Sequence, residues 1–429
     1  MTPKHPSSLS PSLVLLLVAW ELFGGLYILR MSPGALSHDY PHHLLYTQIV
    51  YGQHRLPLPY EGLETYQPPL YYLINAGLGV RNPHHPFWAR LLCLQFGLIA
   101  LALTAWQLER LETTPILQAI ILAFIMTSPS FLFIFANYNN DSLATLLSMV
   151  ILIMTWEMMR RPRNSLAISL CLVMTAALYT KLSVLYAIGA GAVLIITAAL
   201  RRRISRRLAA QWLTAAVVAG ALLLPWMIGH NFIRSGHLLP APADNVIAGF
   251  TGARLPQNPI RTLLMPLGVH PGEWGDPFTH AWGPDPKTKK YSFTAYLFST
   301  WVFDEYEFLY LPALVLWLIV LAHAWAALSG GSQARYTETG RSALLVIAMG
   351  ILLFSSLMFR YPYASLMHFR YIAWVWLPLA IVWAEGARRL NSEVARWMAG
   401  SLKASLVLGT ILHIALWFPL VHQAARWYY

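Results

Sequence analysis

Runs of apolar residues, each about as long as a membrane-crossing helix, alternate with short polar loops along most of the chain. About 20 apolar residues in a helix cross a bilayer. We therefore expect spans over 12–31, 87–108, 115–136, 142–159, 164–180, 183–200, 208–228, 308–328, 342–359, 368–386 and 401–420. A shorter apolar segment, 68–80, is better sized for a helix that lies along the membrane surface. The pattern predicts an all-α polytopic membrane protein with about 11 transmembrane helices.

The positions of Lys and Arg in the loops indicate whether the segment 68–80 crosses the membrane. Cytoplasmic loops of membrane proteins are enriched in Lys and Arg. If 68–80 does not cross, the runs RRPR at 160–163 and RRRISRR at 201–207 both face the cytoplasm, together with the N-terminus. If 68–80 crossed, both runs would face outside. The first apolar run carries no small-residue cleavage site after it, so we expect it to be retained as a helix.

Composition supports the same fold class. The chain of 429 residues is 57% hydrophobic and 11% charged, against about 45–50% and about 25% in soluble domains. Both cysteines, Cys93 and Cys171, lie inside apolar segments, so a disulfide scaffold is excluded. The net charge of +12 is concentrated in loops between spans, and we interpret it as a topology signal rather than a site for nucleic acid.

Two long loops divide the chain into three parts. Residues 1–228 form a transmembrane module that includes the outer loop 32–86 with its surface helix 68–80; residues 229–307 form a larger outer loop, and 308–429 form the last spans. In this topology all six aspartates of the chain fall on the outer face. Preference of aspartate for loops explains only part of this. The outer face is therefore the predicted site of chemistry.

The first outer loop begins with a candidate catalytic group. Asp39 follows the first span directly, and His42 and His43 come one turn later if a helix starts at Pro41. Proline suits the first turn of a helix and aspartate suits its N-cap. The local sequence therefore leaves two interpretations of Asp39 open, a helix cap and a catalytic carboxylate.

Short motifs in this loop resemble a known family. The sequence reads Asp39-Tyr40-Pro41-His42-His43, then Gly52 and Leu56-Pro57, and then Gln67-Pro68-Pro69-Leu70-Tyr71-Tyr72. This is similar to the GT-C glycosyltransferases, in the branch related to protein O-mannosyltransferases and lipid A aminoarabinose transferases. Tyr40 stands where that family usually has glutamate. This chain therefore has one carboxylate where the family motif has two, and the resemblance implies that Asp39 acts alone or with Asp141.

A second motif, Asn137-Tyr138-Asn139-Asn140-Asp141-Ser142, opens the fourth span. It resembles the family's second outer-loop motif, whose acid assists the acceptor or a metal. An Asn-Asp pair before a helix is also an ordinary cap. Because Asp141 shares a face with Asp39, we favour a functional role for it.

The resemblance implies an inverting transfer of a sugar from a polyprenyl-phosphate carrier to an acceptor on the outer face of a bacterial inner membrane. Such a reaction needs a carboxylate base, for which Asp39 is the candidate with Asp141 as second acid. It also needs cations where charge develops on the leaving phosphate. Candidates for binding the lipid phosphate are Lys181, Arg370, His368, His42 and His43. We expect the substrate cavity to be lined by Tyr40, Gln67, Tyr71 and Asn140.

Other interpretations stay open. Lys181 could simply extend its ammonium to the membrane surface. A transferase of whole oligosaccharides from a polyprenyl diphosphate, as in O-antigen ligases, would rely on arginine and histidine instead of an aspartate base. A lipid or sugar transporter would carry charges in the middle of its spans, which hold almost none here apart from Glu21. No tight zinc spacing is present, and Mg²⁺ or Mn²⁺ remains a candidate cofactor because some family members need one.

Overall fold

The computed structural model describes residues 11–30, 39–62, 64–79, 86–238, 338–360, 369–388, 400, 402–411 and 413–414. Every regular element within these ranges is helical. The predicted span 308–328, most of the predicted loop 229–307 and His368 lie outside the described residues.

Among the described residues, five helical segments are long and apolar enough to cross a membrane: Leu13–Arg30, Phe87–Arg110, Asp141–Arg160, Leu182–Leu200 and Arg206–Ser235. They correspond to α1 (Pro11–Arg30), α4 (Phe87–Arg110), α7 (Asp141–Arg160), α9 (Leu185–Leu200) and α10 (Arg206–Trp226). A shorter apolar helix, α8 (Asn164–Leu178), packs against α7 and α10. Together with the composition, these helices make the chain a multi-pass membrane protein. The predicted number of eleven crossings stays a prediction.

The expected span 115–136 is bent in the structure. Helix α5 (Pro115–Thr127) and helix α6 (Pro129–Ala136) meet at an angle of 68°. Ser128 between them has ψ 127°, outside the helical region. Pro129 has no backbone N–H and disfavours a helical conformation in the residue before it, so the apolar run cannot continue as one helix.

The second long loop begins later than expected. The helical segment that starts with α10 does not end near 228. It continues through a π-helical turn (Met227–Phe232) into α11 (Ile233–Ser235). It ends at Gly236, whose φ of 75° is left-handed. Glycine adopts this conformation without steric cost and is the usual residue after a helix end.

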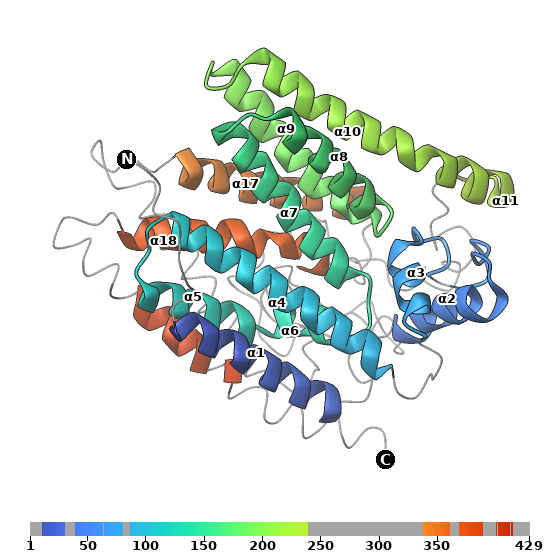
Figure 1. Ribbon diagram of the computed structural model, residues 1–429, viewed down its shortest axis with the longest axis horizontal. Coiled ribbons are helices and arrows are strands. Elements are labelled where there is room, and N and C mark those ends of the chain that lie inside the picture. The colour runs from blue at the N-terminus through green and yellow to red at the C-terminus, as the bar shows by residue number, and fades with distance from the viewer. Residues whose placement is uncertain are drawn as a thin grey trace.

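The described part of the segment between α1 and α4 forms two helices at one end of the bundle (Figure 1). Helix α2 (Tyr40–Gln53) follows Asp39, and α3 (Leu70–Gly77) occupies the middle of the predicted surface segment 68–80. The backbone N–H of Leu70 donates to the carbonyl of Tyr179 over 2.8 Å, which fastens α3 to the end of α8. We call the end of the bundle that carries α2 and α3 the site end.

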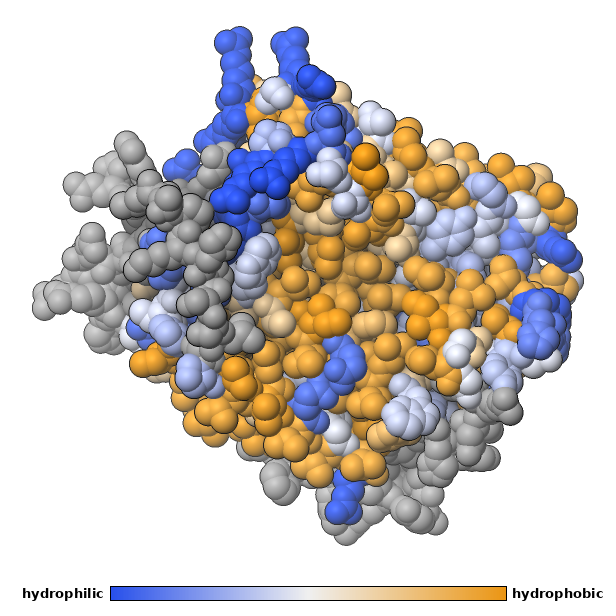
Figure 2. Space-filling model, in the orientation of Figure 1, coloured by the Kyte–Doolittle hydropathy of each residue, from blue (hydrophilic) through white to orange (hydrophobic). Residues whose placement is uncertain are grey.

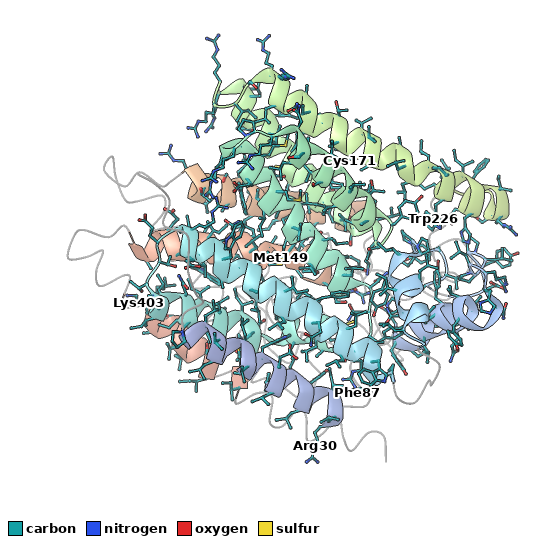
Figure 3. All side chains as sticks on the ribbon, viewed as in Figure 1. Arg30, Phe87, Met149, Cys171, Trp226 and Lys403 are labelled. Carbon is teal, nitrogen blue, oxygen red and sulfur yellow. The ribbon has the colours of Figure 1, made fainter. Side chains whose placement is uncertain are left out.

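The opposite end carries the basic loops. Figure 3 labels Arg30 and Phe87 toward the site end and Lys403 at the other end. Hydrophobic side chains cover the middle of the face in Figure 2, and hydrophilic ones gather where α10 begins. We call this second end the basic end. The separation follows the charge pattern used to predict the topology.

Three elements from the C-terminal part complete the described bundle: α17 (Glu338–Arg360), the 3-10 helix η7 (Phe369–Val375) and α18 (Trp376–Arg388). Helix α17 packs against α9 and α18, and η7 packs against α7. The contact with α7 brings Arg370 to the start of that helix, where Asp141 lies. The C-terminal spans therefore supply part of the site.

Candidate active site

Asp39 occupies the N-cap position of α2, but its side chain does not cap the helix. Its backbone carbonyl accepts from the N–H groups of His42 and His43, over 3.1 and 2.9 Å. The carboxylate is instead bound by the guanidinium of Arg370. The interpretation of Asp39 as a side-chain cap is therefore wrong, and its carboxylate is held at the site end by a cation.

Burial by itself would raise the pKa of Asp39, yet the positive charge of Arg370 outweighs it. The net effect lowers the pKa of Asp39 well below its ordinary value. A nearby opposite charge favours the ionised form of a carboxyl group. Asp39 is thus an ionised, buried carboxylate, 9% exposed, at neutral pH.

A second buried ion pair lies beside the first. The ammonium of Lys181 is 2.6 Å from a carboxylate oxygen of Asp141 and 3.1 Å from the amide oxygen of Asn140. Lys181 is 5% exposed, so the alternative that it extends to the membrane surface is wrong. Asp141 opens α7 as its first residue, where the helix dipole favours a negative charge.

The two pairs form one network. The Nε atom of Arg370 lies 3.8 Å from the second carboxylate oxygen of Asp141. The ring of Tyr371 lies under both cations, 5.2 Å from the guanidinium carbon of Arg370 and 5.4 Å from the ammonium of Lys181. Aromatic faces attract cations at these distances. Two carboxylates and two cations thus lie in contact at the junction of four chain segments.

Glu64 is a third carboxyl group that the sequence analysis missed. It is 7% exposed, and its ligand oxygen lies within 4.8 Å of ligand atoms of Asp39 and His43. Burial, followed by the negative charge of Asp39, raises the pKa of Glu64 to about 8. Glu64 comes 24 residues after Tyr40, just before the Pro-Pro motif, and is not one of the motif residues that resemble the GT-C family.

His43 is held in place by its ring nitrogen Nδ1, which is 2.9 Å from the hydroxyl of Tyr72. Asn140 donates to the same hydroxyl over 3.3 Å. Burial, partly offset by Asp39, lowers the pKa of His43 to about 3, so the ring is neutral. A neutral imidazole can bind a proton or a metal ion but adds no positive charge for a phosphate.

The residues expected to line the cavity lie within or beside an aromatic cluster. Tyr46 and Tyr72 stack with their ring centres 3.7 Å apart, and Tyr40 meets Tyr138 edge-on at 6.1 Å. The hydroxyl of Tyr71 lies 3.3 Å from the sulfur of Cys93. The predicted residues Tyr40, Gln67, Tyr71 and Asn140 are all buried. Of these, Asn140 contacts the charged network directly through Lys181.

Asp39, His43 and Glu64 could hold a divalent cation. Their donor atoms lie within 4.8 Å of one another. In the described part of the chain, Nε2 of His43 and Oε2 of Glu64 are buried without a hydrogen-bond partner. Carboxylate and imidazole donors suit ions such as Mn²⁺, and Mg²⁺ prefers the carboxylates. The arrangement fits a cation but does not require one.

The structure thus brings together Asp39, Asp141, Lys181, Arg370 and His43, which were predicted separately along the chain. His42 is half-buried, and burial lowers its pKa, with Asp39 acting in the opposite direction. The residues that the sequence analysis missed are Glu64 and Tyr371. Tyr371 directly follows Arg370, and an aromatic residue next to a predicted phosphate ligand was the available signal.

No protein-family model matches this chain. No curated protein matches it either. Among solved structures, the chain is similar to the crystal structure of ArnT from Cupriavidus metallidurans bound to undecaprenyl phosphate. The TM-score is 0.40 at 14% sequence identity, over 93% of this chain and 78% of that chain. The similarity concerns a loose arrangement of helices, and the function is therefore argued from the side chains of the site.

Proposed function

We propose that this protein is an inverting glycosyltransferase that moves a sugar from a polyprenyl-phosphate carrier to an acceptor on the outer face of a bacterial inner membrane. One observation carries the proposal: Asp39 is held against Arg370 beside Asp141 and Lys181, at one end of a bundle of apolar helices. A base and phosphate-binding cations in contact are the groups that this transfer needs.

The reaction is a single displacement. The acceptor hydroxyl attacks the anomeric carbon of the donor, the bond from that carbon to the phosphate oxygen breaks, and polyprenyl phosphate leaves with the electron pair. The hydroxyl proton passes to Asp39. Arg370 and Lys181 stabilise the negative charge that grows on the leaving phosphate. Arg370 is suited to this because a guanidinium binds two phosphate oxygens at once.

The ion pairs of the free protein suggest how the base is activated. Arg370 keeps Asp39 ionised but weakly basic. An arriving phosphate competes with Asp39 for the guanidinium. Once Arg370 binds the phosphate, the pKa of Asp39 rises toward its ordinary value, because its nearest cation is neutralised. The carboxylate therefore becomes a stronger base only when the donor is in place.

A divalent cation, if one is used, would be held by Asp39, His43 and Glu64 and would supply further positive charge for the leaving phosphate. Glu64, whose pKa is raised to about 8 in the free protein, would then be ionised by the metal. Activity measured with EDTA and with added Mg²⁺ or Mn²⁺ tests this part separately from the role of Asp39.

The first experiment measures the thermal stabilisation of purified protein in detergent by polyprenyl phosphate. A ligand at 100 times its Kd stabilises the folded state by about 2.7 kcal/mol, so we expect a clear rise in Tm for the wild type. Arg370→Lys and Lys181→Met should lose most of this rise. Arg234→Ala, an exposed arginine also at the site end, should retain it.

The outcomes separate the candidate functions. If no polyprenyl carrier stabilises the wild type, the transferase proposal fails and a transporter becomes the better hypothesis. With a lipid-linked sugar donor, Asp39→Asn should keep carrier binding and lose transfer by about 10²-fold or more. An Asp39→Asn variant with full transfer, beside inactive Arg370 and His43 variants, would instead indicate the oligosaccharide ligase.

A further inference from the structure

A second charged site lies at the basic end of the bundle, far from Asp39 in the fold. A pocket of about 160 Å³ opens between α7, α9 and α17. Its polar lining includes Arg201, Arg203 and Arg341, and its apolar lining consists of Met159, Leu194, Ala198 and Leu345. The catalytic proposal makes no use of it.

The turn after α9 places two of these arginines. The N–H of Arg203 donates to the carbonyl of Ala198 over 2.9 Å, and the N–H of Arg202 donates to that of Ala199 over 3.0 Å. This bond pattern, with the intervening residue left-handed, is a Schellman motif. Arg202 has φ 55° and does not line the pocket, whereas Arg201 and Arg203 on either side of it do. The turn therefore places Arg201 and Arg203 at the pocket and leaves Arg202 outside it.

The charge of the pocket suits an anion. Three arginines line it, and no acidic residue is among the described residues of the lining. The hydroxyl of Ser342 donates to the carbonyl of Thr339 and accepts from the indole of Trp156, so it fixes the wall instead of competing for a ligand. Guanidinium groups from two directions bind phosphate oxygens with defined geometry.

The apolar part of the lining indicates that the phosphate belongs to a lipid. Leu194 and Ala198 are buried in the pocket wall, and Leu200, at the end of the same helix, is 80% exposed. In a bound phospholipid the acyl chain would contact the exposed leucine, and the headgroup would lie in the basic pocket. The volume of about 160 Å³ is many times what a single water molecule needs. This accommodates a phosphate and the atoms attached to it.

We propose that this pocket binds the headgroup phosphate of an anionic phospholipid in the leaflet at the basic end. Anionic lipids attract basic segments at the membrane surface, and basic pockets between transmembrane helices bind lipid headgroups. The bound lipid bridges the turn after α9 and the first turn of α17, because both elements contribute arginines to the lining. It thereby fixes the packing of α17 against α9.

The test compares lipids on the purified full-length protein. In detergent micelles doped with phosphatidylglycerol, the wild type should show a rise in Tm that phosphatidylcholine does not give. Native mass spectrometry should show retained phosphatidylglycerol. Arg201→Gln/Arg341→Gln should bind this lipid at least tenfold more weakly. The control Arg202→Gln, which removes one positive charge from the turn after α9 but outside the pocket, should bind it like the wild type.

A second variant covers the case in which the double variant does not fold. Arg341→Lys keeps the charge but cannot bind two oxygens in one plane, and it should weaken binding while leaving the Tm in phosphatidylcholine unchanged. Equal stabilisation by both lipids would overturn the proposal. So would an equal loss in Arg202→Gln, which would indicate unspecific surface charge. Inorganic phosphate that gives the full rise in Tm would show that the acyl part is not recognised.

Discussion

Asp39 and Arg370 are separated by 331 residues of chain, and the guanidinium of Arg370 donates directly to the carboxylate of Asp39 in the interior of the protein. This contact joins the start of α2 to the short 3-10 helix η7 ahead of α18. Both side chains are largely buried, with 9% of Arg370 and 12% of Asp39 exposed. The pair therefore matters for stability as well as for the proposed chemistry.

Replacing Arg370 should destabilise the protein strongly. Arg370→Leu leaves the charge of Asp39 buried without its main partner, which costs about 3–5 kcal/mol. Chemical unfolding in detergent, followed by circular dichroism, measures this loss. Asp39→Asn/Arg370→Leu should be more stable than Arg370→Leu alone. Arg55→Gln removes an exposed ion pair with Glu61 and should change the Tm little, so an equal effect there would contradict the prediction.

The pair of Lys181 and Asp141 should show strong coupling in a double-mutant cycle. Each single variant, Lys181→Met or Asp141→Asn, leaves one charge of a buried 2.6 Å contact in a less favourable site. The double variant removes both charges, so its loss of stability should be smaller than the sum of the single losses by about 1–3 kcal/mol. Additive losses would mean that the two groups do not interact.

Glu64 should make stability fall at mildly alkaline pH in metal-free protein. Its pKa is raised from an ordinary value of 4.5 to about 8 in the folded protein. A raised pKa contributes stability that is complete below the ordinary value and is lost as the pH rises through the folded value. With EDTA present, the Tm of the wild type should therefore fall between pH 6.5 and 8.

The variant Glu64→Gln isolates this effect, because its amide does not titrate. Its Tm should change less than that of the wild type over the same interval. His43 adds a rise in stability up to about pH 7.5, because burial lowers its folded pKa to about 3 from an ordinary 6.5. This contribution is common to both proteins, so the difference between their curves isolates Glu64. Parallel curves for the two proteins would rule out a raised pKa for Glu64.

Gly97 should tolerate no side chain, because two aromatic residues approach it. A Cβ atom at this position would lie 2.6 Å from Trp20 of α1 and 2.8 Å from Phe135 of α6. Gly97→Ala should therefore cost about 1–3 kcal/mol through overpacking. Gly25→Ala on α1 has no atom within 4 Å of the added Cβ and should be neutral or stabilising by up to about 1 kcal/mol. Thermal unfolding of the two variants in one detergent compares them.

Several helices could be predicted from hydropathy alone. The expected span 87–108 corresponds to Phe87–Arg110, and 142–159 corresponds to Asp141–Arg160. The break at Ser128 was missed because the apolar run continues across it, although Pro129 was visible in the sequence. The π-helical turn after Trp226 was missed because a hydropathy pattern carries no information on the bond register within a helix.

The sequence by itself determined which segments avoid water and which end of the bundle carries the basic loops. Hydropathy and loop charge depend only on residues that are neighbours in the sequence, so both can be predicted for each segment without knowing the rest of the fold. Only the tertiary structure decided that Asp39 meets Arg370, that Lys181 meets Asp141, and that Glu64 joins them. A buried ion pair depends on where two distant segments come to lie, and its energy changes steeply with their separation and solvation.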